Sequence, residues 1–443
     1  MLKDFQNHIE NQLPFLANGK LIIAISGGVD SVVLAHLCKR LKFNYVLAHC
    51  NFNLRGEESD ADEDFLLELA DQLEVEVFIQ SFDTKAYANA NKRSIQMAAR
   101  ELRYDWFNEL ATQLQFDYIL TAHHADDNLE TFLINFTRGT GLNGLTGIPI
   151  LNENIVRPLL PFSRETIEAY ADTNTIIWRE DSTNSSRKYL RNKLRHEVVP
   201  ILKDINPQLL DSFRRTIENL NDTADIVEES LNAVAKRAIV DMGDSGITYK
   251  VSEFKKVNNP KAYLFEMFKD YGFTQWNDIF DLLDAESGKQ VLSHSYRLIK
   301  HREYLILTDL KAFTNVNLTL SEVDVNNGII ETPIGRLTFE IVESIASTSK
   351  NTIYLDKEKL IIPLELKLWS EGDYFQPLGM TGKKKISKYL KDEKLSLVEK
   401  ENTWLLTSNN NVVWVIGKRA DDRFKVTEQT NCIVKIQIAK DGV

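Results

Sequence analysis

Cysteine is scarce in this chain of 443 residues: there are three, at positions 38, 50 and 432, and no C-x-x-C pair. Structural zinc sites, iron–sulfur clusters and disulfide frameworks need closer or paired cysteines, so none of them is expected. No apolar run is long enough to span a membrane, and no signal-peptide pattern opens the sequence. These absences favour a cytoplasmic protein with no membrane partner.

Positive charge is also in short supply, because 53 Lys and Arg stand against 64 Asp and Glu, a formal net charge of −11. That total argues mildly against nucleic-acid binding. Basic residues nevertheless gather in two short segments, 187–195 and 383–394. Since salt screens charge over roughly 8–10 Å, a phosphate backbone responds to such a patch more than to the total. The composition therefore permits an RNA partner.

A candidate phosphate loop follows an apolar run at residues 21–25, which predicts a strand buried on both faces of a parallel sheet. The loop reads Ser26-Gly27-Gly28-Val29-Asp30-Ser31 and leads into a helical pattern. Neither a Walker loop nor the G-x-G-x-x-G fingerprint occurs at this turn. Glycines let backbone N–H groups approach an anion, and the helix N-terminus adds its dipole. The loop predicts a phosphate site, with an ordinary glycine-rich turn as the alternative.

Strand-like runs alternate with helical patterns over the first 130 residues. The runs lie at residues 21–25, 45–49, 75–79 and 118–122. This alternation predicts an α/β fold with a doubly wound parallel sheet, in which ligands bind at the carboxyl ends of the strands.

Length and pattern predict three domains. Residues 1–205 carry the phosphate loop. Residues 206–362 begin with a long helical pattern and continue as a mixed α/β middle domain. Residues 363–443 are rich in short strands and form a small α+β domain.

Carboxylates crowd the end of the fourth strand, in His123-His124-Ala125-Asp126-Asp127-Asn128-Leu129-Glu130. Asp126 and Asp127 precede Glu130 by four and three residues, so these carboxylates can share a helix face. They can receive an ammonium group or hold Mg²⁺ against phosphates, with Asp30 or Asp127 as the metal ligand. Zinc is a weaker option because a third remote ligand is missing, and a capped, solvated helix start is the structural alternative. We interpret the cluster as part of an active site.

Two arginines, Arg100 and Arg103, lie on a helix predicted over residues 94–114. Their spacing suits the stabilisation of phosphate charge, although surface salt bridges explain it equally well. Polar residues that can line a nucleotide pocket follow the second and fourth strands: His49, Asn51, Arg55 and His123.

The basic segments supply candidate RNA contacts. Arg191 and Arg195 belong to a helix predicted over residues 187–199 and ended by Pro200. Lys383, Lys384 and Lys385 follow a glycine-containing turn and resemble a phosphate-contacting loop. A lysine run is more often a solvated edge, which is the alternative.

Several motifs together resemble one family. They are Ser-Gly-Gly-Val-Asp-Ser at 26–31, Ala-Arg-Glu-Leu-Arg-Tyr at 99–104, His-His-Ala-Asp-Asp-Asn-Leu-Glu-Thr at 123–131, Arg-Gly-Thr-Gly-Leu at 138–142 and Trp-Arg-Glu-Asp at 178–181. The chain is similar to the bacterial tRNA(Ile)-lysidine synthetases, PP-loop ATP pyrophosphatases with an adenine nucleotide alpha hydrolase-like fold. The resemblance covers about residues 20–200 and resumes at 369–379 and 417–424.

The resemblance implies a reaction. ATP adenylates the C2 oxygen of the wobble cytidine in a tRNA(Ile) with a CAU anticodon and releases pyrophosphate, and the ε-amine of free L-lysine then displaces AMP to give lysidine. It also implies that residues 26–31 cradle the pyrophosphate, that Asp127 and Glu130 serve metal or lysine, and that Arg100 or Arg103 serves the adenylated intermediate. Arg191, Arg195 and Lys383–Lys385 would contact tRNA.

One departure from the family pattern and several alternatives stay open. Phe52 stands where the family often has a histidine, so no catalytic role is expected there beyond stacking or packing. A PP-loop tRNA thiolase is the alternative enzyme, although this chain lacks a C-x-x-C pair. An amidating synthetase would need a glutaminase domain, and none is apparent; a non-catalytic RNA-binding scaffold is the remaining option. The sequence leaves the oligomeric state open, with a homodimer as one option.

Overall fold

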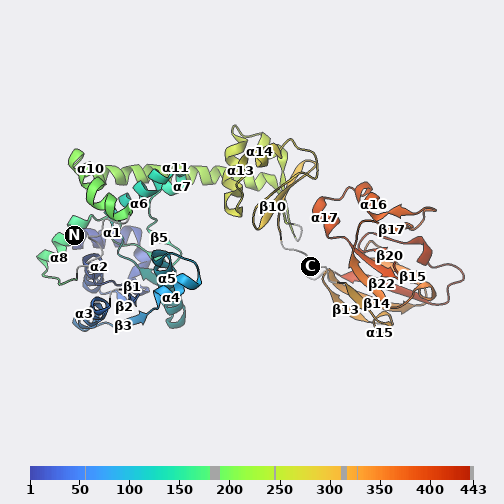
Figure 1. Cartoon of the computed structure of the whole chain (residues 1–443), viewed down its shortest axis with the longest axis horizontal. Helices are drawn as coiled ribbons and strands as arrows, with labels where there is room; N and C mark the ends of the chain where they lie inside the picture. Colours follow the sequence, from blue (N-terminus) through green and yellow to red (C-terminus); the bar gives the residue numbers. More distant parts are fainter. Residues whose placement is uncertain (55, 180–189, 244–245, 311–316, 327, 440–443) are drawn as a thin grey trace. The chain divides into compact units, whose positions relative to one another are not determined.

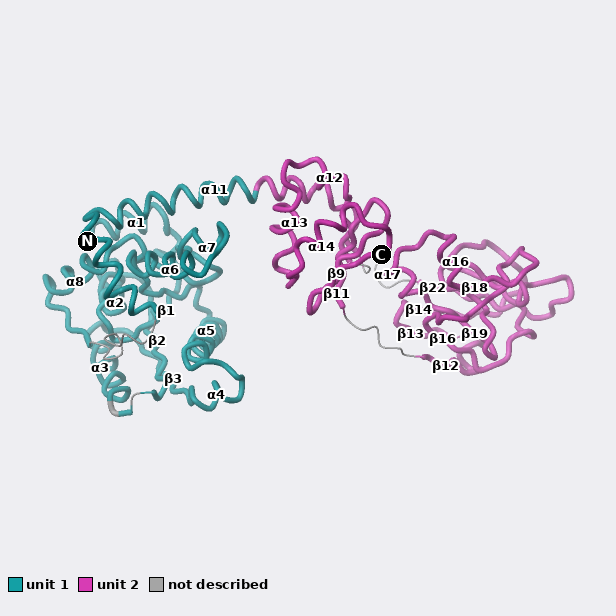
Figure 2. Tube along the Cα trace, turned by 45° about the horizontal axis from the view of Figure 1, so that its top comes forward, with its two compact units in different colours: residues 1–228 teal, residues 229–443 magenta. Residues whose placement is uncertain are grey.

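The computed structural model describes residues 1–54, 56–179, 190–243, 246–310, 317–326 and 328–439. The chain forms two compact units, Met1–Glu228 and Glu229–Val443, which Figure 2 colours separately. The boundary falls within a long helix, α11 (Leu209–Ala238). Each unit has its own sheets and its own hydrophobic core.

The first unit is built on a sheet with the strand order β3-β2-β1-β4-β6-β5, of which β1, β2, β3 and β5 are labelled in Figure 1. The strands are β1 (Lys20–Ala24), β2 (Asn44–Asn51), β3 (Val77–Ser81), β4 (Tyr118–Leu120), β5 (Leu151–Asn152) and β6 (Ile155–Val156). Every pairing is parallel except that between β5 and β6. The predicted parallel sheet is confirmed, with β3 starting two residues later than expected.

Helices pack on both faces of this sheet. Leu21 and Ile23 of β1 belong to one core, with side chains from α1 (Leu2–Gln12), α2 (Val29–Arg40), α3 (Glu57–Leu73) and α8 (Arg164–Thr173). Ile22 belongs to a second core, which contains residues of α5 (Ile95–Leu114). Because successive side chains of a strand point to opposite faces, a strand covered on both sides must be apolar at every position. The sheet is therefore doubly wound, as predicted.

The remaining helices of the first unit include the one that carries the carboxylate cluster. They are η1 (Pro14–Ala17), α4 (Thr84–Ala90), α6 (Ala125–Arg138), α7 (Leu142–Leu145), α9 (Leu190–Lys193) and α10 (Val199–Ile205). Leu129 of α6 packs against Phe213 and Ile217 of α11, so α11 contacts the helix that carries the carboxylates.

The predicted end of the basic helix at Pro200 is wrong. A π-helical turn, labelled η3, covers Leu194–Val198 and continues directly into α10, in whose first turn Pro200 lies. Proline fits a first helical turn, and the π-helical turn before it is a local departure from the α-helical hydrogen-bond pattern. Residues 187–189, the start of the predicted helix, lie outside the described residues.

The second unit begins with an antiparallel sheet of order β7-β8-β11-β10-β9. Its strands are β7 (Ile239–Gly243), β8 (Gly246–Lys250), β9 (Gln290–Leu292), β10 (Tyr296–His301) and β11 (Tyr304–Asp309). The helices are α12 (Val251–Lys255), α13 (Pro260–Phe268), η4 (Lys269–Tyr271) and α14 (Trp276–Asp281). Phe254, Phe268 and Ile279 join the strands in one core.

Two further sheets share a core around Trp414, with the orders β12-β16-β19-β20-β21 and β13-β14-β22-β15. Their strands are β12 (Leu318–Leu320), β13 (Ile329–Thr332), β14 (Gly335–Val342), β15 (Thr352–Asp356), β16 (Leu364–Leu368), β19 (Trp404–Ser408), β20 (Asn411–Val415), β21 (Arg419–Ala420) and β22 (Ile433–Ala439). A small pair, β17 (Tyr374–Phe375) and β18 (Lys384–Lys385), and the helices α15 (Glu322–Val325), η5 (Lys357–Lys359), α16 (Ile386–Asp392), α17 (Leu397–Glu401) and η6 (Asp422–Phe424) complete the unit. The boundary expected at 362–363 falls between strands that pair with each other, β12 with β16 and β14 with β22.

No helix within the described part of the chain combines the length and apolar character needed to cross a membrane.

Candidate active site

The predicted phosphate loop, Ser26–Ser31, joins the carboxyl end of β1 to the start of α2. Gly27 has a φ of 85°, a conformation that side chains disfavour, so the turn requires glycine there. The hydroxyl of Ser31 accepts from the N–H of Ser26 at 3.1 Å and donates to the carbonyl of Gly28 at 3.0 Å. These bonds fix the loop against the N-terminus of a 12-residue helix, which is the arrangement that binds phosphate.

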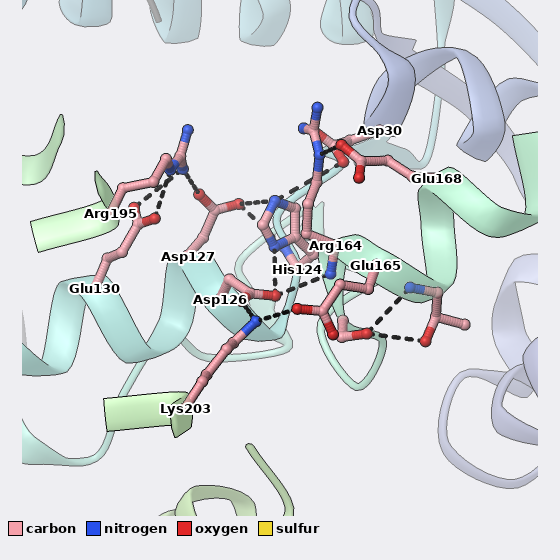
Figure 3. A network of polar contacts seen from close by, with 12 residues as sticks. Asp30, His124, Asp126, Asp127, Glu130, Arg164, Glu165, Glu168, Arg195 and Lys203 are labelled. Atoms are coloured by element: carbon pink, nitrogen blue, oxygen red, sulfur yellow. Dashed lines mark hydrogen bonds and ion pairs between the residues drawn. The ribbon is translucent and has the colours of Figure 1, made fainter. Parts of the chain in front are cut away.

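Carboxylates from two elements converge on the buried side chain of His124 (Figure 3). Its Nε2 lies 3.8 Å from Asp30 of the phosphate loop and 3.4 Å from Asp127 of α6. Its Nδ1 lies 3.7 Å from Asp126. The structure therefore brings the predicted Asp30 together with the predicted carboxylates of α6, because β1 and β4 are adjacent parallel strands.

Cations from residues that follow β6 pair with each carboxylate (Figure 3). Arg164 of α8 binds Asp30 and also donates its backbone N–H to Asp126 at 2.8 Å. Lys203 of α10 lies 2.8 Å from Asp126. The same two cations also pair with carboxylates of α8, Arg164 with Glu168 at 2.6 Å and Lys203 with Glu165 at 2.7 Å.

Two of the predicted RNA-contacting residues, Arg191 and Arg195, lie in this same cluster. Arg195 donates to Glu130 at 2.6 Å and to Asp127 at 3.0 Å. Arg191 donates to the hydroxyl of Thr131 at 2.6 Å and lies 3.5 Å from Glu130. Their guanidinium groups therefore contact carboxylates, although both side chains remain partly exposed to solvent.

Burial and neighbouring charge set the carboxylate pKa values in opposite directions. Burial raises the pKa of Asp30 and of Glu130, and the nearby cations only partly offset it. Burial also acts to raise the pKa of Asp127, but His124, His123 and Arg195 outweigh it and leave that pKa below its ordinary value. The helix α6 therefore carries two different carboxylates: Asp127 holds its negative charge, and Glu130 accepts a proton more readily.

Two observations bear on the predicted Mg²⁺ site, one against it and one in its favour. No group of three or more His, Cys, Asp or Glu side chains suited to a metal occurs among the described residues. Oδ1 of Asp30, however, is buried and has no hydrogen-bond partner in the described structure, so it retains the lone pairs that a cation would use. Magnesium usually binds one or two carboxylates together with substrate phosphates, and Asp30 beside the phosphate loop fits that mode.

The other predicted nucleotide-pocket residues lie at the same sheet edge. His49 Nδ1 is 2.9 Å from the carbonyl of Ile25, and Asn51 donates to Glu63 at 2.6 Å. His123 Nδ1 is 2.9 Å from the hydroxyl of Thr121, and burial lowers the pKa of His123 to about 4. The predicted Arg55 lies outside the described residues.

The arginines of α5 lie over aromatic rings. Arg100 is 4.9 Å from the ring centre of Tyr104, and Arg103 is 5.3 Å from that of Phe52. Phe52 therefore packs, as expected, and serves as a platform for Arg103.

The predicted lysine loop belongs to the second unit. Lys383 lies over the ring of Tyr374 at 4.7 Å, while Lys384 pairs with Asp392 at 2.8 Å. Lys384 and Lys385 form the strand β18, which pairs with Tyr374 and Phe375.

Sequence reasoning missed Arg164, Lys203 and the central position of His124. Arg164 comes 134 residues after its partner Asp30, and no local pattern connects the two. Ser163 caps α8 and so places Arg164 in its first turn, and such a capping serine is the local signal that a sequence could offer.

Comparisons with known proteins cover nearly the whole chain. A model described as PP-loop domain matches residues 1–202, one described as TilS substrate binding domain matches 243–310, and one described as TilS substrate C-terminal domain matches 364–438. A protein of Parabacteroides distasonis named tRNA(Ile)-lysidine synthase is 40% identical over 98% of this chain and 99% of its own length. The chain belongs to the tRNA(Ile)-lysidine synthase family.

Two further members of the tRNA(Ile)-lysidine synthase family show the same extent. That of Bacteroides thetaiotaomicron is 37% identical over 97% of this chain and 98% of its own length. That of Porphyromonas gingivalis strain W83 is 35% identical over 92% of this chain and 91% of its own length. The family inferred from the motifs is therefore confirmed, as is the PP-loop fold of the first unit.

Proposed function

We propose that this chain is the ATP-dependent ligase that joins free L-lysine to C2 of the wobble cytidine in tRNA(Ile) with a CAU anticodon. The products are lysidine in the tRNA, AMP and pyrophosphate. The observation that carries the proposal is the full-length match to proteins named tRNA(Ile)-lysidine synthase, with the phosphate loop and the carboxylates of α6 joined around His124. ATP and tRNA are both cytoplasmic, so the reaction belongs there.

The first step uses the phosphate loop. Its backbone N–H groups and the N-terminus of α2 bind the pyrophosphate portion of ATP while the oxygen at C2 of cytidine attacks the α-phosphate. Asp30 or Asp127 would hold Mg²⁺, which neutralises phosphate charge when bound. Arg100 and Arg103 are the groups we assign to the charge that develops on the α-phosphate.

The second step uses the carboxylates. The lysine ε-amine forms the new C–N bond at C2 while the bond from C2 to the AMP oxygen breaks. Asp127 and Glu130 attract the ammonium group of the incoming lysine, and its proton must leave before attack. Glu130 is suited to take that proton, because burial raises its pKa toward the working pH.

Contacts with tRNA are assigned to both units. Lys383 and Lys385 present positive charge near Tyr374 without a carboxylate partner among the described residues, so they can bind phosphate. Arg191 and Arg195 would reach RNA only by exchanging their carboxylate contacts for phosphate. Asn51 and His49 are assigned to the nucleotide pocket.

The deciding experiment measures pyrophosphate release from ATP with free lysine and CAU-anticodon tRNA(Ile), each omitted in turn. Pyrophosphate release that depends on the tRNA, together with lysine in the recovered RNA, supports the ligase. Sulfur incorporation without lysine would instead support the thiolase alternative. Asp30→Ala should abolish turnover and leave tRNA binding intact, whereas Asp222→Ala, on the exposed face of α11, should retain activity. Unchanged turnover in Asp30→Ala would contradict the assignment.

A further inference from the structure

A buried arginine without a counter-charge lies at the active edge of the sheet. Arg157 directly follows β6, which runs parallel to β4, so its backbone emerges at the same edge as His123. Its side chain is only 6% exposed. Placing a guanidinium charge away from water costs free energy unless other groups compensate it.

The hydrogen bonds of Arg157 supply little compensation. Its Nη1 donates to the carbonyl of Pro149 at 2.7 Å, and the side chain of Tyr104 lies near enough to act on its charge. Its Nε has no partner among the described residues, and no carboxylate of that part of the chain pairs with it. Consistent with an uncompensated charge, burial lowers the pKa of Arg157 and Arg100 lowers it further.

The other arginines of the site differ in this respect. Arg164 is paired with Asp30, and Arg195 with Glu130. Each of those buried or half-buried charges therefore has its opposite within the protein. For Arg157, the missing negative charge has to come from elsewhere.

The surroundings of Arg157 are positive. Arg100 lies over the ring of Tyr104, a residue that is also a neighbour of Arg157. Burial is the main reason that the pKa of His123 falls to about 4; Asp127 opposes the fall, while Arg157, Arg191 and Arg100 add to it, so the ring is neutral at pH 7. Two guanidinium groups thus share one tyrosine beside an uncharged imidazole, and an anion placed there would gain from both.

We propose that Arg157 and Arg100, joined through Tyr104, form a phosphate-binding subsite at the end of β6. The inference rests on the proposed function, which supplies two phosphate sources. One is the α-phosphate of ATP, and the other is the backbone phosphate beside the wobble cytidine. Both are phosphate esters that a guanidinium group binds through paired N–H donors.

The competing explanation is structural. Through its bond to Pro149, Arg157 could simply fasten the turn that leads into β5 and β6. In that case, replacing Arg157 would lower the melting temperature of the protein and leave its affinities for ATP and tRNA unchanged.

The test uses Arg157→Met, which removes the charge at similar length, and Arg157→Lys, which retains the charge without the fork of donors. Tyr104→Phe keeps the ring under Arg100 but removes the hydroxyl. Arg215→Met, at an exposed position of α11, is the matched control. For each full-length variant, KM for ATP, KM for CAU-anticodon tRNA(Ile), kcat and the melting temperature are measured.

We expect Arg157→Met to raise one KM at least tenfold and Arg157→Lys to raise the same KM by less. A rise confined to tRNA identifies the backbone phosphate, and a rise confined to ATP identifies the α-phosphate. Both KM values within twofold of wild type, or a change in kcat or melting temperature alone, would overturn the subsite. If Arg157→Met does not fold, Arg157→Lys and Tyr104→Phe decide by the same criteria. Absence of lysine incorporation by the wild-type chain would count against the proposed function rather than against this subsite.

Discussion

Arg195 forms a forked ion pair with Glu130, a residue 65 positions earlier in the chain: Nε lies 2.6 Å from Oε1 and Nη2 3.0 Å from Oε2. Glu130 is 1% exposed, whereas Arg195 is 31% exposed. The carboxylate is therefore fixed in the protein interior and the arginine comes to it from the surface. Substrates that use Glu130 must act in the presence of this guanidinium group.

Arg195→Ala should destabilise the first unit, because it leaves the buried carboxylate of Glu130 without its main partner. Breaking one side of such a pair costs roughly 3 kcal/mol, the lower end of the usual range because Arg195 is partly solvated. Adding Glu130→Gln should recover much of the loss, since the uncompensated charge is then gone. Urea denaturation followed by fluorescence measures both, with Arg215→Ala as the exposed control. If Arg195→Ala is as stable as that control, the ion pair between Arg195 and Glu130 contributes nothing to the free energy of unfolding.

The lysine loop predicts a graded salt response. Lys383 over Tyr374 is available to phosphate, whereas Lys384 already pairs with Asp392 at 2.8 Å. Lys383→Ala should weaken tRNA binding and reduce the slope of log Kd against log salt by about one. Lys384→Ala should change the slope by less. Filter binding over a range of salt concentrations distinguishes them, and equal slopes for wild type and Lys383→Ala would remove that residue from the RNA surface.

Local sequence was enough to predict the phosphate loop and the carboxylates after β4, because each is a short motif fixed by its own strand and helix. The ion pairs between Arg164 and Asp30 and between Arg195 and Glu130 could not be predicted, since they depend on which distant helices pack together. The end of the basic helix was predicted wrongly for a local reason. Pro200 cannot donate a helical hydrogen bond, but it is compatible with the first turn of a helix. In the second unit, β14 pairs with β22 some 95 residues later, a distance at which strand periodicity carries no information on partners.

The contact between Arg103 and Phe52 predicts a positioning effect. The ring holds the guanidinium at 5.3 Å and is itself packed on Phe82 at 6.0 Å. Phe52→Ala should free Arg103 and lower kcat several-fold, whereas Phe52→Leu, which fills similar volume without a π face, separates packing from the cation–π contact. Single-turnover assays with saturating ATP and tRNA report the effect. A Phe52→Leu variant with full activity would show that packing alone is sufficient.

His123 predicts a pH effect on stability whose sign follows from its environment. Burial, with Arg157, Arg191 and Arg100 and against the opposing effect of Asp127, lowers its pKa from 6.5 to about 4. Between those values the unfolded chain binds the proton and the folded chain does not, so stability falls as the pH falls from about 6.5 to about 4. The loss of folding stability attributable to one such group is at most about 3 kcal/mol.

Asp30 and Glu130, whose pKa values are raised, act in the opposite sense, so a comparison of variants is needed to isolate His123. His123→Gln should make the decline with acidity shallower, while His294→Gln, at an exposed position of the second unit, should follow the wild type. Melting temperatures measured from pH 7 to pH 4.5 provide the comparison, and parallel curves for His123→Gln and wild type would mean that His123 titrates normally.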